Sequence, residues 1–212
     1  MLPGLEQLGQ VHFADLNQGA SIEGMAQGLL TALPDNGIII GFSLGGYVAR
    51  HLAWLAHQKN KSIRGLVLLN TSARASTADE DNKNRQQIKL LEHYPYKGQT
   101  MTALRRALHP QRQDDAVMLA HLQAMSLALG KQVFLQQLSI VRADGHHELP
   151  QITCPSLVVA SRNDQMRSLS ESEKLASGLP NAKLHVFEDC GHMSPLEKAP
   201  GLITALENWL RK

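Results

Sequence analysis

A serine between two glycines, at the point where the hydrophobic pattern changes period, constrains this chain most strongly. The run Ile38-Ile39-Ile40 has the β-branched character of a buried strand. After Gly41 to Gly46, apolar residues recur at helical spacing, as Val48, Leu52 and Leu55 do. The pattern therefore predicts a strand, a sharp turn and a helix, with Ser43 at the turn.

The pentapeptide Gly41-Phe42-Ser43-Leu44-Gly45 fits G-x-S-x-G, the nucleophile elbow. Glycines two residues before and two residues after Ser43 would remove side chains that collide in so tight a turn. The helix that follows points its N-terminus at the serine, and the backbone N–H of Leu44 can donate to an oxyanion. The alternative interpretation is a glycine-rich turn with a passive serine.

Further strand-like runs alternate with helical patterns along the chain. We expect strands at Val11–Leu16, Ile63–Leu69, Ser156–Ala160 and Lys183–Phe187, with helices at Ile22–Leu33, Leu169–Leu179 and from Pro200 onward. Ser21 is the expected N-cap of the first of these helices. This alternation predicts an α/β fold, a mostly parallel sheet with helices on both faces, which binds ligands at the carboxyl ends of its strands.

The segment between the two halves of this pattern has no good strand. Apolar residues have helical spacing from Val117 to Leu129 and from Phe134 to Val141, with Gly130 between the two helices. We therefore predict a core formed by residues 1–73 and 151–212, interrupted by an all-helical insertion, the cap, at residues 74–150.

A nucleophilic serine needs a base, and the base needs an orienting acid. His192 follows the last predicted strand and Asp164 follows the one before, so both are expected at the carboxyl edge beside Ser43. Asp189 is a rival for the acid, but it lies only three residues before His192 and is expected to shape the loop. The alternatives are a surface histidine and a solvated turn aspartate.

The order Ser43, Asp164, His192 resembles the α/β-hydrolase superfamily, in its capped esterase, lactonase and lyase branches. The resemblance extends from about Val11 to the C-terminus, and its specific parts are Gly41–Gly46, Ser161–Asp164 and Cys190–Pro200. It implies a serine hydrolase with an acyl-enzyme intermediate, and a helical cap over the substrate pocket.

The sequence departs from the family at its start, because only ten residues precede Val11. The resemblance implies further leading strands, and a turn that supplies the second oxyanion donor. Leu5–Leu8 is expected to belong to a helix instead. One missing strand would lie between Val11–Leu16 and Ile38–Ile40. The sheet must then close up, remain defective, or borrow a strand from a partner, which would make a homodimer.

Three functions fit these observations. The first is hydrolysis of a small ester or related acyl compound by Ser43, His192 and Asp164. The second is C–C bond hydrolysis or elimination on an acidic metabolite by the same residues, supported by the basic cluster Arg105, Arg106, His109 and Arg112. The third is a shortened, non-catalytic domain, which the missing strands suggest.

Composition narrows the choice of partners. The 212 residues carry a formal net charge of +2, which gives no broad basic face for nucleic acid. No apolar run approaches the ~18–20 residues of a membrane span, and no signal peptide is visible. Cys154 and Cys190 are expected at opposite ends of the sheet, unpaired. We expect a cytoplasmic protein that acts on a small molecule, with no cofactor. We also expect no metal, because His146-His147 lacks further ligands at metal-binding spacing and is predicted to lie in a solvated loop.

Overall fold

The computed structural model describes residues 1–211, and its centre is a parallel sheet. The strands are β1 (Gly37–Phe42), β2 (Ile63–Leu69), β3 (Ser156–Ser161) and β4 (Ala182–Phe187), in the spatial order β1-β2-β3-β4. Every neighbouring pair is parallel. The four strands expected between Ile38 and Phe187 are confirmed, and so is the predicted α/β class.

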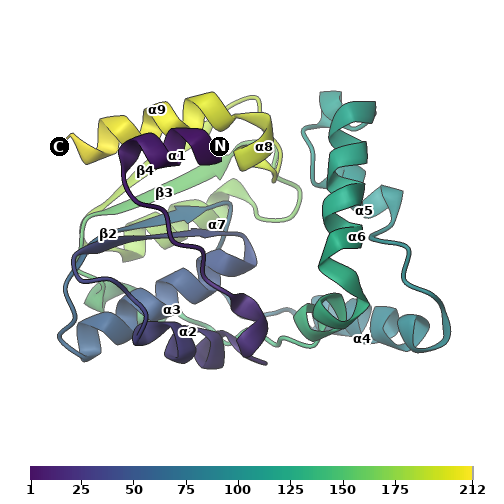
Figure 1. The fold of residues 1–212 in the computed structure, drawn as a ribbon, viewed down its shortest axis with the longest axis horizontal. Helices are drawn as coiled ribbons and strands as arrows, with labels where there is room; N and C mark the ends of the chain where they lie inside the picture. The colour runs from purple at the N-terminus through teal and green to yellow at the C-terminus, as the bar shows by residue number, and fades with distance from the viewer. Residues whose placement is uncertain (212) are drawn as a thin grey trace.

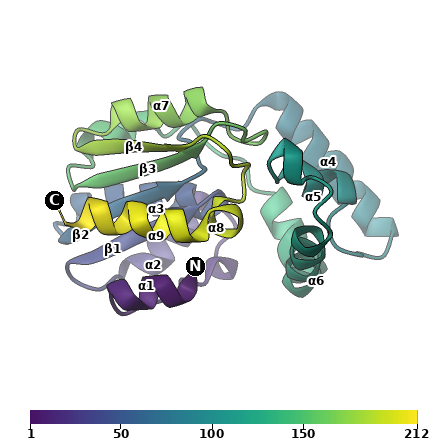
Figure 2. The ribbon, with the colours of Figure 1, turned by 90° about the horizontal axis from the view of Figure 1, so that it is seen from above.

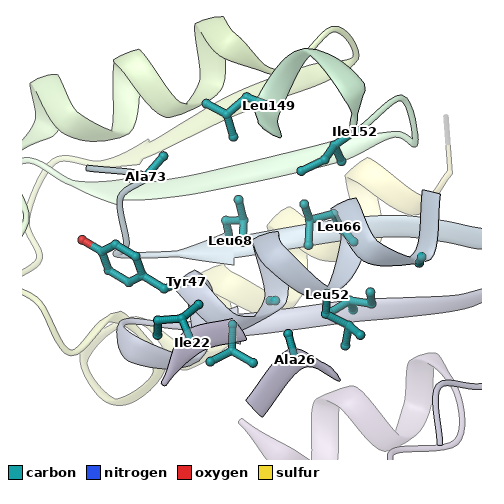
Figure 3. Packing of buried hydrophobic residues seen from close by; sticks show 14 of the residues in the cluster. Ile22, Ala26, Tyr47, Leu52, Leu66, Leu68, Ala73, Leu149 and Ile152 are labelled. Atoms are coloured by element: carbon teal, nitrogen blue, oxygen red, sulfur yellow. The ribbon is translucent and has the colours of Figure 1, made fainter. Parts of the chain in front are cut away.

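Helices cover both faces of the sheet, as Figure 1 shows. On one face lie α2 (Ile22–Leu30), α3 (Leu44–Gln58) and α7 (Leu169–Gly178). Their apolar residues enclose Leu66 and Leu68 of β2, and Figure 3 shows these beside Leu52, Tyr47 and Ile22. This two-sided burial explains why the central strands read as continuous hydrophobic runs.

The opposite face is covered by α1 (Leu2–Leu8) and α9 (Ala199–Leu210) (Figure 1). Leu202 and Leu206 of α9 pack on the alternate residues Val67 and Leu69 of β2. The helix predicted around Leu5–Leu8 is therefore confirmed. A single turn, α8 (Ser194–Glu197), precedes α9.

Side-chain caps fix where several helices begin. Ser21 Oγ accepts a hydrogen bond from Gly24 N–H at 3.0 Å, as the predicted N-cap of α2 should. That helix ends at Leu30, earlier than the predicted Leu33. Capping boxes begin α4 at Thr77 and α7 at Ser168.

Residues 78–138 form helices that lie to one side of the sheet (Figures 1 and 2). They are α4 (Ala78–His93), α5 (Met101–Arg106) and α6 (Ala116–Leu138), followed by the 3-10 helix η3 (His146–Gln151), with a shorter 3-10 turn, η2 (Pro110–Arg112), before α6. Gly130 interrupts α6 with φ 79° and ψ 161°, so the predicted break between two helices is confirmed. Leu104, Leu108, Leu119 and Leu122 form a small separate core. The boundaries at 74 and 150 stay a prediction.

The strand predicted at Val11–Leu16 is wrong. Residues 11–15 have no regular structure, and Leu16–Gln18 forms a 3-10 turn, η1. A short run becomes a strand only beside a partner strand, and here Phe13 is 80% exposed. Within residues 1–211 the sheet does not close up, so β1 is an edge strand. An apolar cavity of about 580 Å³ lies beside β1. Residues of α1, of the segment that follows α1 and of β1 itself line it.

Within residues 1–211, no helix is both long and apolar enough to cross a membrane.

Candidate active site

The turn after β1 has the strained geometry that the elbow pattern predicts. Ser43 has φ 50° and ψ −116°, in the positive-φ region that residues other than glycine rarely adopt. Its N–H donates to the Leu69 carbonyl oxygen of β2 at 2.9 Å, which fixes the turn to the neighbouring strand. A Cβ at Gly41 would lie 2.4 Å from the Gly45 carbonyl oxygen. Only glycine therefore fits at position 41.

The glycine required on the far side of the serine is Gly46, and the prediction that Gly45 prevents a collision is wrong. A Cβ at Gly45 would have its nearest neighbour at 3.8 Å, an ordinary contact. A Cβ at Gly46 would lie 2.5 Å from Thr71 Cβ. At this point the start of α3 lies against Thr71, which follows β2. Glycine is therefore required at position 46 by the contact between α3 and the end of β2, and not by the turn itself.

His192 lies between Ser43 and Asp164. Its Nε2 is 2.9 Å from Ser43 Oγ, and its Nδ1 is 2.8 Å from Asp164 Oδ2. The imidazole is 3% exposed and packs on Phe42, with ring centroids 5.1 Å apart. With Nδ1 protonated and donating to the carboxylate, Nε2 is free to accept the serine proton.

The Asp164 carboxylate is buried and surrounded by donors. Its Oδ1 accepts the backbone N–H groups of Met166 and Arg167 at 2.7 and 2.9 Å, while Oδ2 accepts from His192. Burial opposes ionisation, but the hydrogen bonds from His192, Arg167 and Met166 outweigh it and lower the pKa of Asp164. The group is held as an anion.

The fold brings these residues together because each follows a different parallel strand. Ser43 comes after β1, Asp164 after β3 and His192 after β4, so all lie at the carboxyl edge. Leu44 is the first residue of α3, where a helix N–H has no partner within the helix. The Leu44 N–H therefore lies at the N-terminus of α3, directly after Ser43, at the position expected for an oxyanion donor.

Asn70, at the end of β2, completes the carboxyl edge and was not predicted as a site residue. Its Nδ2 donates to Asp164 Oδ2 at 3.0 Å, and the side chain is 1% exposed. Because asparagine has no carboxylate, the sequence excluded Asn70 as the orienting acid. Its position directly after a strand did indicate that it lies at the carboxyl edge of the sheet.

Glu197 fixes the loop that bears His192. Its side chain is fully buried, and it accepts from the N–H groups of Gly191 and His109, each at 2.9 Å, and from Arg112 Nε at 2.8 Å. Gly191 allows a close approach between this loop and His109. A Cβ there would lie 2.4 Å from His109 N. The His192 loop is thereby held against residues 107–112 of the helical segment.

A single carboxylate, Glu80 in the first turn of α4, joins both ends of the helical segment to the Asp164 loop. It binds Arg74 and Arg142, with closest N–O distances of 2.8 and 2.9 Å, and Arg167 at 3.4 Å. The hydrogen bonds from Arg74 are the main reason that the pKa of Glu80 is far below its usual value. Arg142 and Arg167 also stack over the Tyr47 ring.

The rival residues lie elsewhere. Asp189 binds Arg112 and Lys198 at 3.2 and 3.1 Å, which agrees with its expected part in shaping the loop. Cys154 and Cys190 are unpaired, and burial raises the pKa of the Cys190 thiol to about 11. His146 pairs with Asp144 at 2.5 Å. Among residues 1–211, no three His, Cys, Asp or Glu side chains gather as metal ligands would.

Comparison with known proteins identifies the family of the chain. The family model described as alpha/beta hydrolase fold matches residues 11–199. The protein of Stutzerimonas stutzeri that bears the name "Putative carbamate hydrolase RutD" is 32% identical over 198 residues, which cover 85% of this chain and 70% of that protein. A pimeloyl-[acyl-carrier protein] methyl ester esterase of Aromatoleum aromaticum is 28% identical over 219 residues, covering 92% and 82%.

A solved structure supports the fold. The thermophilic esterase from Thermogutta terrifontis superposes with a TM-score of 0.77 at 24% identity, over 90% of this chain and 72% of that one. The family match, the relatives matched over most of their length and the parallel sheet agree with one another, and the chain belongs to the alpha/beta hydrolase family and is a hydrolase.

Proposed function

We propose that this hydrolase cleaves a small ester or related acyl compound, with Ser43 as nucleophile, His192 as base and Asp164 as the orienting acid. The observation that carries the proposal is the continuous set of contacts from Ser43 Oγ through His192 to Asp164, at 2.9 and 2.8 Å. These distances are within the range that proton transfer and orientation require. The esterase relative supports the substrate class.

In the proposed reaction, Ser43 Oγ attacks the substrate carbonyl carbon while its proton passes to His192 Nε2. The Leu44 N–H stabilises the negative charge on the tetrahedral oxygen. Collapse breaks the bond to the leaving alkoxide, which takes the proton from His192, and an acyl-Ser43 ester remains. A water molecule then attacks this ester by the same steps, releasing the acid and restoring Ser43. Asp164 remains ionised and fixes the imidazole tautomer.

A fluorophosphonate probe tests the nucleophile. We expect wild-type protein to be labelled and Ser43→Ala to be unlabelled. Ser139→Ala, which changes a serine at the end of α6, is the matched control and should label normally. Turnover of p-nitrophenyl acetate should fall by at least about 10³-fold in Ser43→Ala. Equal labelling of Ser43→Ala and wild type would exclude Ser43 as the nucleophile.

One contact favours the second function, C–C bond hydrolysis or elimination on an acidic metabolite. Arg106 Nη2 donates to the Gln165 carbonyl oxygen at 2.8 Å, which brings a cation next to Asp164. Arg105 instead pairs with Asp114 at 3.3 Å and is half exposed. If Arg106 binds a substrate carboxylate, Arg106→Glu should raise KM for acidic substrates but not for neutral esters, and Arg105→Glu should raise neither. An equal effect on both substrate types would reject this function.

The third function, a non-catalytic domain, is distinguished by the same turnover assay together with analytical ultracentrifugation. A stable monomer or homodimer that hydrolyses esters no faster than its Ser43→Ala variant would favour that function over ester hydrolysis.

A further inference from the structure

We infer that Asn70 is a positioning residue, which orients the Asp164 carboxylate toward His192 through a buried hydrogen-bond chain that begins at Ser194. This inference rests on the proposed function, because it assigns a role to Asn70 in the same reaction. It concerns a residue at the end of β2, a strand that contributes no member of the Ser43, His192 and Asp164 set.

The Asn70 amide has a partner for each of its groups. Its Nδ2 donates to Asp164 Oδ2 at 3.0 Å and to Ser161 Oγ at 2.9 Å. Its Oδ1 accepts from Ser194 Oγ at 2.5 Å. A carboxylate can only accept, so the amide must present its nitrogen to Asp164 and its oxygen to Ser194. The Asp164 carboxylate thereby fixes which way the amide points, and the Ser194 hydroxyl holds the amide oxygen from the other side.

The two oxygens of Asp164 are held from different sides. The backbone N–H groups of Met166 and Arg167 hold Oδ1, whereas Oδ2 has His192 Nδ1 at 2.8 Å and Asn70 Nδ2 at 3.0 Å. Asn70 is therefore the side-chain donor that shares an oxygen with the imidazole. Without it, Oδ2 loses the contact that fixes its position relative to His192.

The backbone at Asn70 is strained, which is consistent with a position selected for its side chain. Its φ is 46°, yet its N–H still bonds to the Val159 carbonyl oxygen at 2.9 Å. Glycine would adopt this conformation without strain. Asn60, with φ 53°, has the same kind of backbone in an exposed turn after α3. It provides a matched control.

Asn70→Gly separates the effect of the side chain from that of the backbone, because glycine keeps the positive φ and the substitution removes only the side chain. We expect kcat for p-nitrophenyl acetate to fall by about 10- to 100-fold, with KM within about twofold of wild type, as the loss of one hydrogen bond to a charged group suggests. Asn60→Gly should change neither constant. Asn70→Asp keeps an acceptor for Ser194 but places a carboxylate against Asp164, and should lower kcat further.

A spectroscopic measurement does not depend on turnover. The proton between His192 Nδ1 and Asp164 Oδ2 should give a low-field proton NMR resonance in wild type, assigned by its loss in His192→Ala. In Asn70→Gly it should shift or disappear through exchange with solvent, and in Asn60→Gly it should be unchanged. If wild type shows no esterase activity, the proposed function fails, and this resonance alone decides the role of Asn70.

If Asn70→Gly does not fold, Ser194→Ala serves instead, because it removes the donor that holds the amide oxygen while leaving Asn70 in place. It should lower kcat by a smaller factor and move the same resonance. An Asn70→Gly or Ser194→Ala protein with kcat within twofold of wild type and an unchanged resonance would overturn the inference.

Discussion

Replacing Glu197 by alanine should destabilise the protein more than any loss of a surface charge. Its side chain is 0% exposed, and its two oxygens accept from two backbone N–H groups and from Arg112. Alanine would leave the N–H groups of Gly191 and His109 without their acceptor. It would also leave the Arg112 guanidinium with only its partly exposed partner, Asp189.

The magnitude follows from these contacts. Breaking a buried ion pair by removing one partner costs about 3–5 kcal/mol, and each buried N–H left unsatisfied costs about 1–3 kcal/mol within that total. A change of 1 kcal/mol shifts Tm by about 2–4 °C in a chain of this size. We therefore expect Tm of Glu197→Ala to fall by roughly 6–20 °C. Glu197→Gln keeps the shape and one acceptor and should lose about half as much.

Thermal unfolding followed by circular dichroism measures this change. Glu188→Ala is the matched control, because Glu188 also pairs with an arginine, Arg162, but its side chain is 67% exposed. It should leave Tm unchanged. If Glu197→Ala and Glu188→Ala unfold within about 2 °C of each other, burial of the Glu197 contacts is not what stabilises the His192 loop.

Two further predictions concern the cap junction and the elbow. The pKa of Glu80 is lowered in the folded state, so the stability it provides is fully present above its ordinary pKa of 4.5 and is lost progressively as the pH falls below that value. Urea unfolding should show Glu80→Gln less stable than wild type at pH 7, and the difference should become steadily smaller as the pH is lowered from about 5 toward 2. Equal stability at pH 7 would contradict this role. Gly46→Ala should cost about 1–3 kcal/mol, because its Cβ would meet Thr71 at 2.5 Å, whereas Gly45→Ala should be tolerated. Urea unfolding of the two variants compares them directly, and equal losses would refute the steric argument.

The elements of the fold could be predicted where local pattern and tertiary burial agree. The aliphatic runs of β2 and β3 become strands, because a parallel strand buried on both faces needs apolar residues at consecutive positions. The β-branched run of β1 also becomes a strand, at the edge of the sheet, where Ile40 is 40% exposed. Ser21 and Gly130 marked a helix start and a helix break correctly, since caps and breaks depend on neighbouring residues alone. Val11–Leu16 is a mixed run that includes His12 and Asp15, it has no neighbouring strand, and it is not a strand.

The candidate site could be predicted in part for the same reason. The positions of Ser43, Asp164 and His192 after their strands were enough to bring them to one edge, and the contacts among them lie at hydrogen-bond distance. Asn70 and Glu197 were not predicted as site residues, because no sequence motif links them to their partners as one links Ser43, Asp164 and His192. Asn70 bonds to a residue 94 positions away, and Glu197 to one 88 positions away.

The sequence by itself determined the class of fold, the strained serine turn and the order of the three candidate catalytic residues. Each strand, helix and turn is a local pattern, and the order of the three residues is read directly along the chain. The tertiary structure decided what holds those residues in place. Asn70 fixes Asp164, Glu197 fixes the loop of His192, and Glu80 joins the helical segment to the acid loop. It also decided that β1, which bears the serine turn, has a paired neighbour on one side only within residues 1–211. Contacts between distant segments depend on how the sheet and helices assemble, and no local pattern records them.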